Sequence, residues 1–146
     1  MMDLPVSHTV THAHHGDDQV TLSYAERFLR RKVLETGGGL RFLVDLAQTT
    51  SLGPGDAFRL EDGRRIAVIS AAEELFEIRG DLTRLAWHIG NRHTPCQIEP
   101  DRLLIQRDHV LHDMLMKLGA QVSEVVAPFM PEGGAYGHGR THGHAH

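Results

Sequence analysis

Apolar and polar residues alternate with a period of two through much of the first half of the chain, which is the pattern of half-buried β-strands. The segment LRFLVDLA shows it best, because Leu40, Phe42 and Val44 fall on one face. Asp62-Gly63 is a strong signal for a tight hairpin. Strands are predicted at 19–22, 32–36, 40–47, 57–60 and 65–70. Short strands joined by tight turns favour a small barrel or two packed sheets.

The spacing of apolar residues changes after about residue 75. A helix is predicted from Asp81, whose carboxylate can accept the first free amide protons. Its apolar stripe is Leu82, Leu85, Ala86 and Ile89. We expect Gly90 to end this helix in the left-handed conformation and Pro95 to prevent its resumption. A second helix is predicted at 108–118, ended by Gly119.

Four further strands are predicted in the second half of the chain, at 75–79, 96–99, 102–106 and 121–127. With the two helices they give the order β-α-β-β-α-β, which is the ferredoxin-like unit. The predicted fold class is therefore α+β, a small all-β N-terminal domain (19–75) followed by a ferredoxin-like βαββαβ domain (76–130). Residues 1–18 and 131–146 are rich in His, Gly and Pro, and we expect little order in either.

Composition narrows the class of protein. The chain of 146 residues is 40% apolar with a net charge of −4, which argues against a nucleic-acid or anionic-membrane partner. The one dense basic patch, RFLRRK (27–32), suggests an edge strand or a solvated face. A single cysteine, Cys96, excludes an intramolecular disulfide. No signal peptide or membrane-spanning run is visible, so we expect a cytoplasmic protein.

Twelve histidines are the unusual feature of the composition. Four crowd each end of the chain, and four lie in the interior at His88, His93, His109 and His112. Irregularly spaced imidazoles on a backbone that is expected to be flexible bind borderline divalent metals loosely. Imidazole without thiolate suits Ni(II), Zn(II) or Cu(II) rather than Ca(II) or Mg(II). No complete catalytic constellation is found.

The interior histidines leave alternatives open. His93 follows a helix end, where an imidazole can bond the last carbonyls or serve as a ligand. His109 and His112 stand at i and i+3, a spacing that allows chelation of one ion but also fits a solvated face. His88 is interpreted as structural and Cys96 as a small apolar residue.

Several motifs together resemble the UreE-type urease accessory proteins, which are nickel metallochaperones. The family-like motifs are GNRHTPCQI (90–98), DHVLHDML (108–115), LEDGRRIAV (60–68) and APFMPEGGAYGHG (127–139). The resemblance covers about residues 19–139.

This resemblance implies a symmetric homodimer that is not an enzyme. The β domain would bind partners, and the ferredoxin-like domain would bind metal and dimerise. His93 matches the histidine that binds metal at the dimer interface, and His109 matches a secondary position. His112 has no firm counterpart and remains a candidate from its spacing. The histidine-rich tail, with candidates His142, His144 and His146, would extend metal capacity.

The resemblance also implies the cargo and the partners. We expect Ni(II), with Zn(II) or Cu(II) as alternatives, to be delivered to the urease apoprotein and its accessory complex through a GTPase partner. One imidazole per chain cannot hold Ni(II) well, but a two-fold axis brings two copies of His93 together. The alternatives are a general metal-buffering protein, a metal-dependent hydrolase, and an interaction or RNA-binding module.

Overall fold

The computed structural model describes residues 3–133, and these residues form two compact units that meet in sequence at Ala71 and Ala72. Strands make up the described part of the first unit, and the second combines strands with helices. The predicted α+β fold class is confirmed. The boundary lies a few residues before the predicted position near 75, because Ala72 already begins a strand of the second unit.

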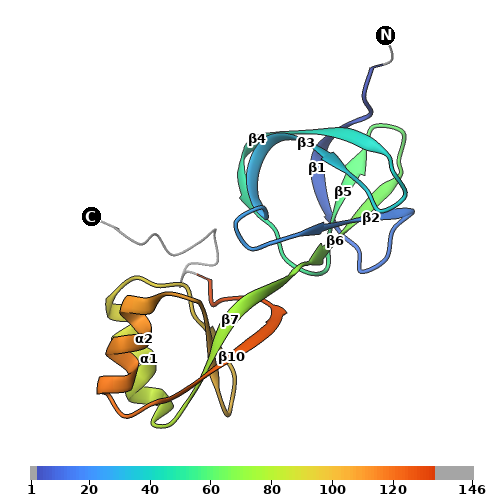
Figure 1. Ribbon diagram of the computed structural model, residues 1–146. Helices are drawn as coiled ribbons and strands as arrows, with labels where there is room; N and C mark the ends of the chain where they lie inside the picture. The colour runs from blue at the N-terminus through green and yellow to red at the C-terminus, as the bar shows by residue number, and fades with distance from the viewer. Residues whose placement is uncertain (1–2, 134–146) are drawn as a thin grey trace. The chain divides into compact units, whose positions relative to one another are not determined.

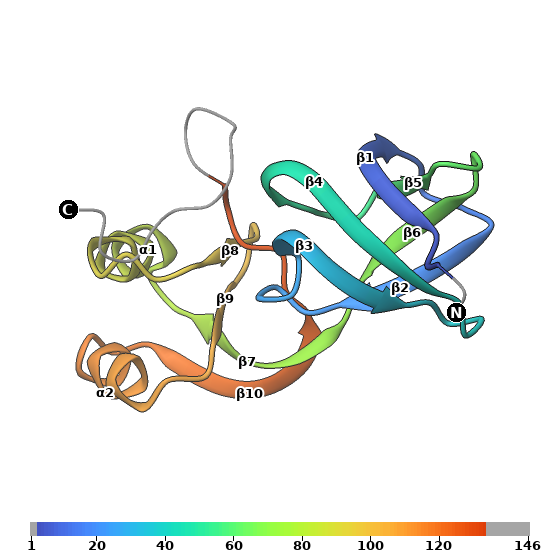
Figure 2. The same ribbon diagram turned by 90° about the horizontal axis from the view of Figure 1, so that it is seen from above.

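Among the described residues of the first unit, six strands form one strongly curved sheet (Figures 1 and 2). They are β1 (Val6–His12), β2 (Asp18–Leu22), β3 (Phe28–Glu35), β4 (Arg41–Ser51), β5 (Asp56–Leu60) and β6 (Arg65–Ser70). Their order is β2-β6-β5-β1-β4-β3. The apolar face encloses a core that includes Phe42, Phe58 and Ile66, all fully buried. The apolar residues of the alternating pattern that predicted the strands therefore face this core.

The prediction of little order in residues 1–18 is wrong for most of that segment. Strand β1 pairs in parallel with β4 and antiparallel with β5, so it lies inside the sheet. Ser7 is fully buried, and the amide of Leu43 donates to the carbonyl of Pro5 over 2.8 Å. Pairing with distant strands orders this segment despite its polar composition, because backbone hydrogen bonds do not depend on side-chain polarity.

The basic segment 27–32 lies largely on β3, which is an edge strand of this sheet. This location agrees with the edge strand that the sequence suggested as one of two alternatives. Arg30 and Arg31 lie near the carboxylate of Asp45 on the neighbouring strand β4, at 4.0 and 3.4 Å. Charged side chains on an edge strand hinder pairing with another chain. The patch is therefore partly neutralised within the molecule.

The described part of the second unit follows the predicted order β-α-β-β-α-β. Its elements are β7 (Ala72–Arg79), α1 (Leu82–Asn91), β8 (Gln97–Ile98), β9 (Leu103–Gln106), α2 (His109–Lys117) and β10 (Gln121–Pro128). The four strands are antiparallel in the order β10-β7-β9-β8. Both helices lie on the same side of this sheet (Figure 2), and Ile78, Leu85, Ile89 and Leu115 pack in the core between the two layers.

Acidic residues begin both of these helices. The side chain of Asp81 accepts from the amide of Arg84 at 3.3 Å, and that of Asp108 accepts from the amides of Val110 and Leu111 at 2.8 and 3.1 Å. Gly119, with φ of 81°, follows the end of α2 as predicted. Within residues 3–133, no helix is long and apolar enough to span a membrane.

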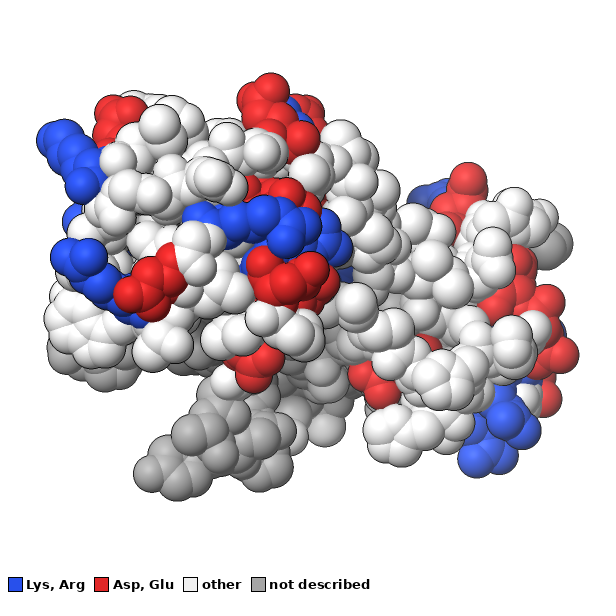
Figure 3. Space-filling view, turned by 90° about the horizontal axis from the view of Figure 1, so that it is seen from below, with Lys and Arg blue, Asp and Glu red and all other residues white. Residues whose placement is uncertain are grey.

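Acidic and basic side chains are interspersed on the face drawn in Figure 3. In the second unit, Arg102 lies 2.9 Å from Glu77 and 3.0 Å from Glu99, and Arg107 lies 3.0 Å from Glu74. These ion pairs leave little uncompensated positive charge around Arg102 and Arg107.

Candidate metal centre

His93 lies in the loop that follows α1, and its backbone is held in the left-handed conformation with φ of 57°. Within residues 3–133 it is the one non-glycine residue with a positive φ. The amide of His93 donates to the carbonyl of Gly90 over 2.9 Å, and that of Arg92 donates to the carbonyl of Ile89 over 3.1 Å. These bonds close the last turn of the helix onto the loop and hold the backbone of His93 in place.

The prediction that Gly90 adopts the left-handed conformation is wrong. Gly90 lies inside α1, which continues to Asn91, and His93 takes the left-handed conformation instead. Nothing lies within 4 Å of the position a β-carbon of Gly90 would occupy, so this glycine leaves open space beside the loop. The left-handed residue that follows the helix is therefore His93 itself, and histidine is among the non-glycine residues that best tolerate this conformation.

The side chain of His93 is exposed and lines a hollow of about 160 Å³. Apolar atoms dominate the rest of this hollow, which is lined by Ala86, Gly90, Thr94, Pro95, Cys96, Ile98 and Glu132. Ile98 is 52% exposed, and Trp87, one turn before Gly90 and Asn91 on α1, is 62% exposed. An exposed imidazole amid exposed apolar side chains is typical of a contact surface.

Cys96 lines the same hollow, but its chemistry differs from that of a metal-binding thiolate. Burial, followed by the nearby charge of Glu132, raises the pKa of the thiol to about 11. Its sulfur lies 3.9 Å from the carbonyl oxygen of Gln97, a weak contact. The thiol therefore stays protonated at neutral pH, in keeping with its interpretation as a small apolar residue.

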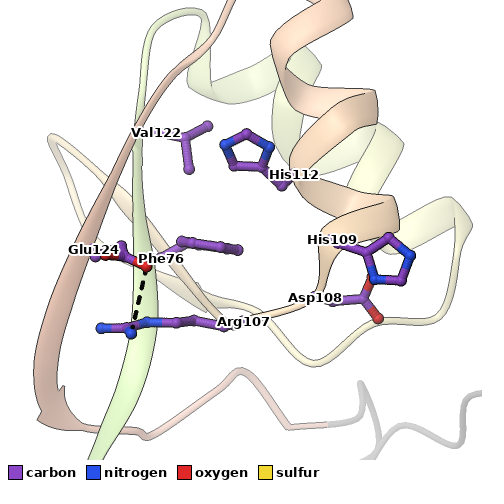
Figure 4. A pocket seen from close by; sticks show the side chains of 7 residues that line it. All are labelled: Phe76, Arg107, Asp108, His109, His112, Val122 and Glu124. Carbon is purple, nitrogen blue, oxygen red and sulfur yellow. Dashed lines mark ion pairs between the residues drawn. The ribbon is translucent and has the colours of Figure 1, made fainter.

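His109 and His112 both belong to α2, yet their rings do not converge. In Figure 4 the His112 ring lies toward Phe76 and Val122, whereas the His109 ring points away from them. The centroids of the His112 and Phe76 rings are 5.4 Å apart. Nδ1 of His112 lies 3.4 Å from a carboxylate oxygen of Asp113. The structure therefore does not bring the two imidazoles together as the i, i+3 spacing suggested.

One histidine from each helix lines a common hollow, which the sequence did not indicate. His88 of α1 and His109 of α2 line one hollow of about 600 Å³, together with Asp113 and the apolar Val110, Met114 and Leu118. Helical spacing reports only which residues of one helix share a face, so it gave no signal for this proximity. The ring of His88 also packs edge-on against that of Trp87, with centroids 5.0 Å apart.

No three metal-ligating side chains of residues 3–133 are close enough together to hold an ion. The candidates His142, His144 and His146 lie outside the described residues. Within the described part of one chain, His93 is therefore an exposed, well-held single donor on an apolar surface.

Comparison with known families covers nearly the whole chain. The family described as UreE urease accessory protein, N-terminal domain, matches residues 4–71, and its C-terminal domain counterpart matches residues 66–146. This chain belongs to the UreE family of urease accessory proteins.

Individual relatives agree with the family. A urease accessory protein UreE of Ruegeria pomeroyi is 67% identical over 149 aligned residues, covering 99% of this chain and all of that protein. One from Cereibacter sphaeroides is 63% identical over 87% of this chain and 70% of its own length. One from Rhodobacter capsulatus is 60% identical over 88% of this chain and 83% of its own. The chain is thus an accessory protein with a role in urease maturation rather than an enzyme, and the hydrolase alternative is set aside.

Proposed function

We propose that this UreE-family protein binds Ni(II) as its cargo at a site made by His93 from two copies of the chain, and delivers the ion for assembly of the urease active site. Zn(II) and Cu(II) are the alternative ions that imidazole donors accept. Family membership supports the role in urease maturation. The metal, the homodimer and the delivery step are the parts that we propose.

The position of His93 is the observation that carries this proposal. The hydrogen bond to Gly90 holds the left-handed backbone of His93, while its side chain stays exposed beside apolar residues. In a two-fold symmetric interface a residue near the axis meets its own copy. Association through the surface around Ile98 and Trp87 would pair the two rings and bury apolar area.

Such a site would be incomplete, which suits transfer. Ni(II) takes about four to six nitrogen and oxygen donors, and two imidazoles supply part of that number. Waters or tail histidines, among them His142, His144 and His146, would complete the coordination. We assign His109 and His112 to weaker, separate binding, because their rings diverge. An ion held by few fixed donors can pass to an acceptor.

The proposed partners follow from the same role. The ion would pass to the urease apoprotein and its accessory complex through a GTPase partner, in the cytoplasm. The all-β unit would supply the partner-binding surface, and the second unit would hold the metal and the dimer contact.

Equilibrium dialysis with Ni(II) tests this proposal in the wild type and in His93→Asn. Asparagine tolerates the left-handed backbone, so this variant removes the imidazole with little change in the loop. We expect the tightest site, one ion per two chains, to be lost, and to remain in the matched variant His109→Asn. A tight site that is unchanged in His93→Asn would refute the proposal.

The same dialysis, repeated at lower pH, tests whether imidazole groups bind the ion. Free imidazole has a pKa of about 6.5, and its protonated form cannot bind a metal. We therefore expect the wild type to release Ni(II) as the pH falls through about 6. Retention of the ion at pH 5 would contradict ligation by imidazole.

General metal buffering is the second candidate function, favoured by the twelve histidines of the chain. It predicts several sites of similar affinity and no privileged role for His93. A binding isotherm of the wild type with one class of equivalent sites would favour buffering over delivery.

A further inference from the structure

A histidine and a carboxylate face each other in the first unit, at the end of β1. His12 and Asp56 are direct partners in the antiparallel pairing of β1 with β5. Nδ1 of His12 lies 3.2 Å from Oδ1 of Asp56. The His12 side chain is 95% exposed, whereas that of Asp56 is 21% exposed. The imidazole is therefore open to solvent, and the carboxylate is set into the protein surface.

The carboxylate of Asp56 is held by the turn before β5. Its Oδ2 accepts from the amide of Gly53 over 2.8 Å, which leaves Oδ1 directed at His12. The amide of Ala13 donates to the carbonyl of Gly55 over 2.8 Å and ties the end of β1 to this turn. His12 and Asp56 therefore both belong to segments whose backbone is hydrogen-bonded to the rest of the unit.

A second imidazole, that of His14, lies beside Gly55 in the turn before Asp56. Cε1 of His14 is 3.0 Å from the position that a β-carbon of Gly55 would occupy, and Gly55 directly precedes Asp56. Glycine is required there, because a side chain would meet the His14 ring and because φ of Gly55 is 92°. The lack of a side chain at Gly55 thus lets the His14 ring lie against the turn that precedes Asp56.

We propose that His12 and Asp56 form a second binding site for a borderline divalent cation such as Zn(II) or Ni(II). Two bonds of about 2.1 Å at a near right angle place their donor atoms about 3.0 Å apart. The observed 3.2 Å between Nδ1 of His12 and Oδ1 of Asp56 already approaches this separation, so an ion can bind both atoms with little movement of the side chains. Waters would supply the further donors.

His8, on the same strand, is the natural comparison. Its Nδ1 lies 3.0 Å from the carbonyl oxygen of Asp45, and its Nε2 lies 3.6 Å from a carboxylate oxygen of Glu61. One nitrogen is thus used by a backbone carbonyl, and the other is farther from its carboxylate than in the His12 pair. A site defined by donor geometry should therefore depend on His12 and not on His8.

The second site is independent of the proposed function, because it uses none of the residues assigned to the His93 centre. The test is a Zn(II) titration followed by amide chemical shifts of the full-length chain, in a background carrying His93→Asn and His→Asn changes at His138, His142, His144 and His146. The variants compared are His12→Asn, Asp56→Asn and the matched control His8→Asn. Asparagine at 56 keeps an oxygen that can accept from Gly53.

We expect saturable shifts centred on residues 12–14 and 55–56, with affinity reduced about tenfold or more by His12→Asn or Asp56→Asn and unchanged by His8→Asn. Absence of saturable shifts in this region would overturn the second site. Equal losses in the His8 and His12 variants would also overturn it, because they would indicate unspecific binding by surface histidines. Since His93 is absent throughout, neither result bears on the proposed delivery function.

Discussion

The left-handed backbone of His93 stores strain at a residue proposed to bind metal. For residues other than glycine this conformation is less stable by about 1–2 kcal/mol. Gly90, three residues earlier, keeps an ordinary helical conformation. The left-handed conformation is therefore adopted by a histidine, although a glycine would adopt it with less strain. A strained backbone at a residue with an exposed imidazole is consistent with a role of the side chain in function rather than in stability.

Replacement of His93 by glycine should therefore separate stability from metal binding. We expect His93→Gly to raise the free energy of unfolding by about 0.5–1 kcal/mol, because relief of strain outweighs the entropy gained by the unfolded chain. Urea unfolding at a fixed chain concentration measures this change. Thr94→Gly, at a neighbouring position without a positive φ, should lower stability instead. Equal losses in both variants would show that His93 is not strained.

Cys96 allows a test of protonation near the same hollow. Because burial raises the pKa of its thiol to about 11, alkylation by iodoacetamide should be slow at pH 7 and should accelerate as the pH approaches 11. In denaturant the pKa of the same thiol should be about 8.5. The pH profile of the alkylation rate measures both values. An apparent pKa at or below the denatured value would show instead that Cys96 is an activated thiolate.

At the scale of elements, the sequence predicted the order of the second unit because its helices and strands have strong local periodicity. It missed β1, since the segment VSHTVTH is largely polar and gains its order from β4 and β5, which lie more than thirty residues away. It placed the helix end at Gly90 because a local glycine signal cannot show which residue turns the chain. The divergence of His109 and His112 depends on packing against Phe76, which helical spacing does not encode.

The arginine–carboxylate network of the second unit should make stability depend on pH. Hydrogen bonds from Arg102 and then Arg79 lower the pKa of Glu77. A carboxylate with a lowered pKa in the folded state stabilises the fold above its unfolded pKa of about 4.3, and this contribution is lost as the pH falls through the folded value.

Glu77→Gln should therefore lower the free energy of unfolding by about 1 kcal/mol at pH 7 and by much less near pH 3. Urea unfolding at the two pH values measures the difference. The matched variant Glu124→Gln removes a carboxylate that is 71% exposed and 3.5 Å from Arg107, and we expect a change below about 0.5 kcal/mol at pH 7. A loss in Glu77→Gln that is the same at both pH values would indicate that packing, rather than charge, is responsible.

At the scale of the whole molecule, His93 is an exposed donor on a hydrogen-bonded backbone, and residues 3–133 contain no group of three ligating side chains close enough to hold an ion. The proposed delivery of Ni(II) requires that the ion be released, and a site divided between two chains would permit release. The motif GNRHTPCQI pointed to His93 from the sequence. Its left-handed backbone and apolar surroundings became visible only in the fold.

The most direct test of the His93 centre is the order in which Ni(II) broadens the amide signals of the wild-type protein. Paramagnetic Ni(II), added at less than one ion per two chains, broadens signals close to its tightest site. We predict that the amides of residues 90–94 disappear first, with those near His12 and His109 following only at higher metal. If residues 109–113 or 12–14 lose their signals first while 90–94 stay sharp, the primary site is not at His93 and the account is contradicted.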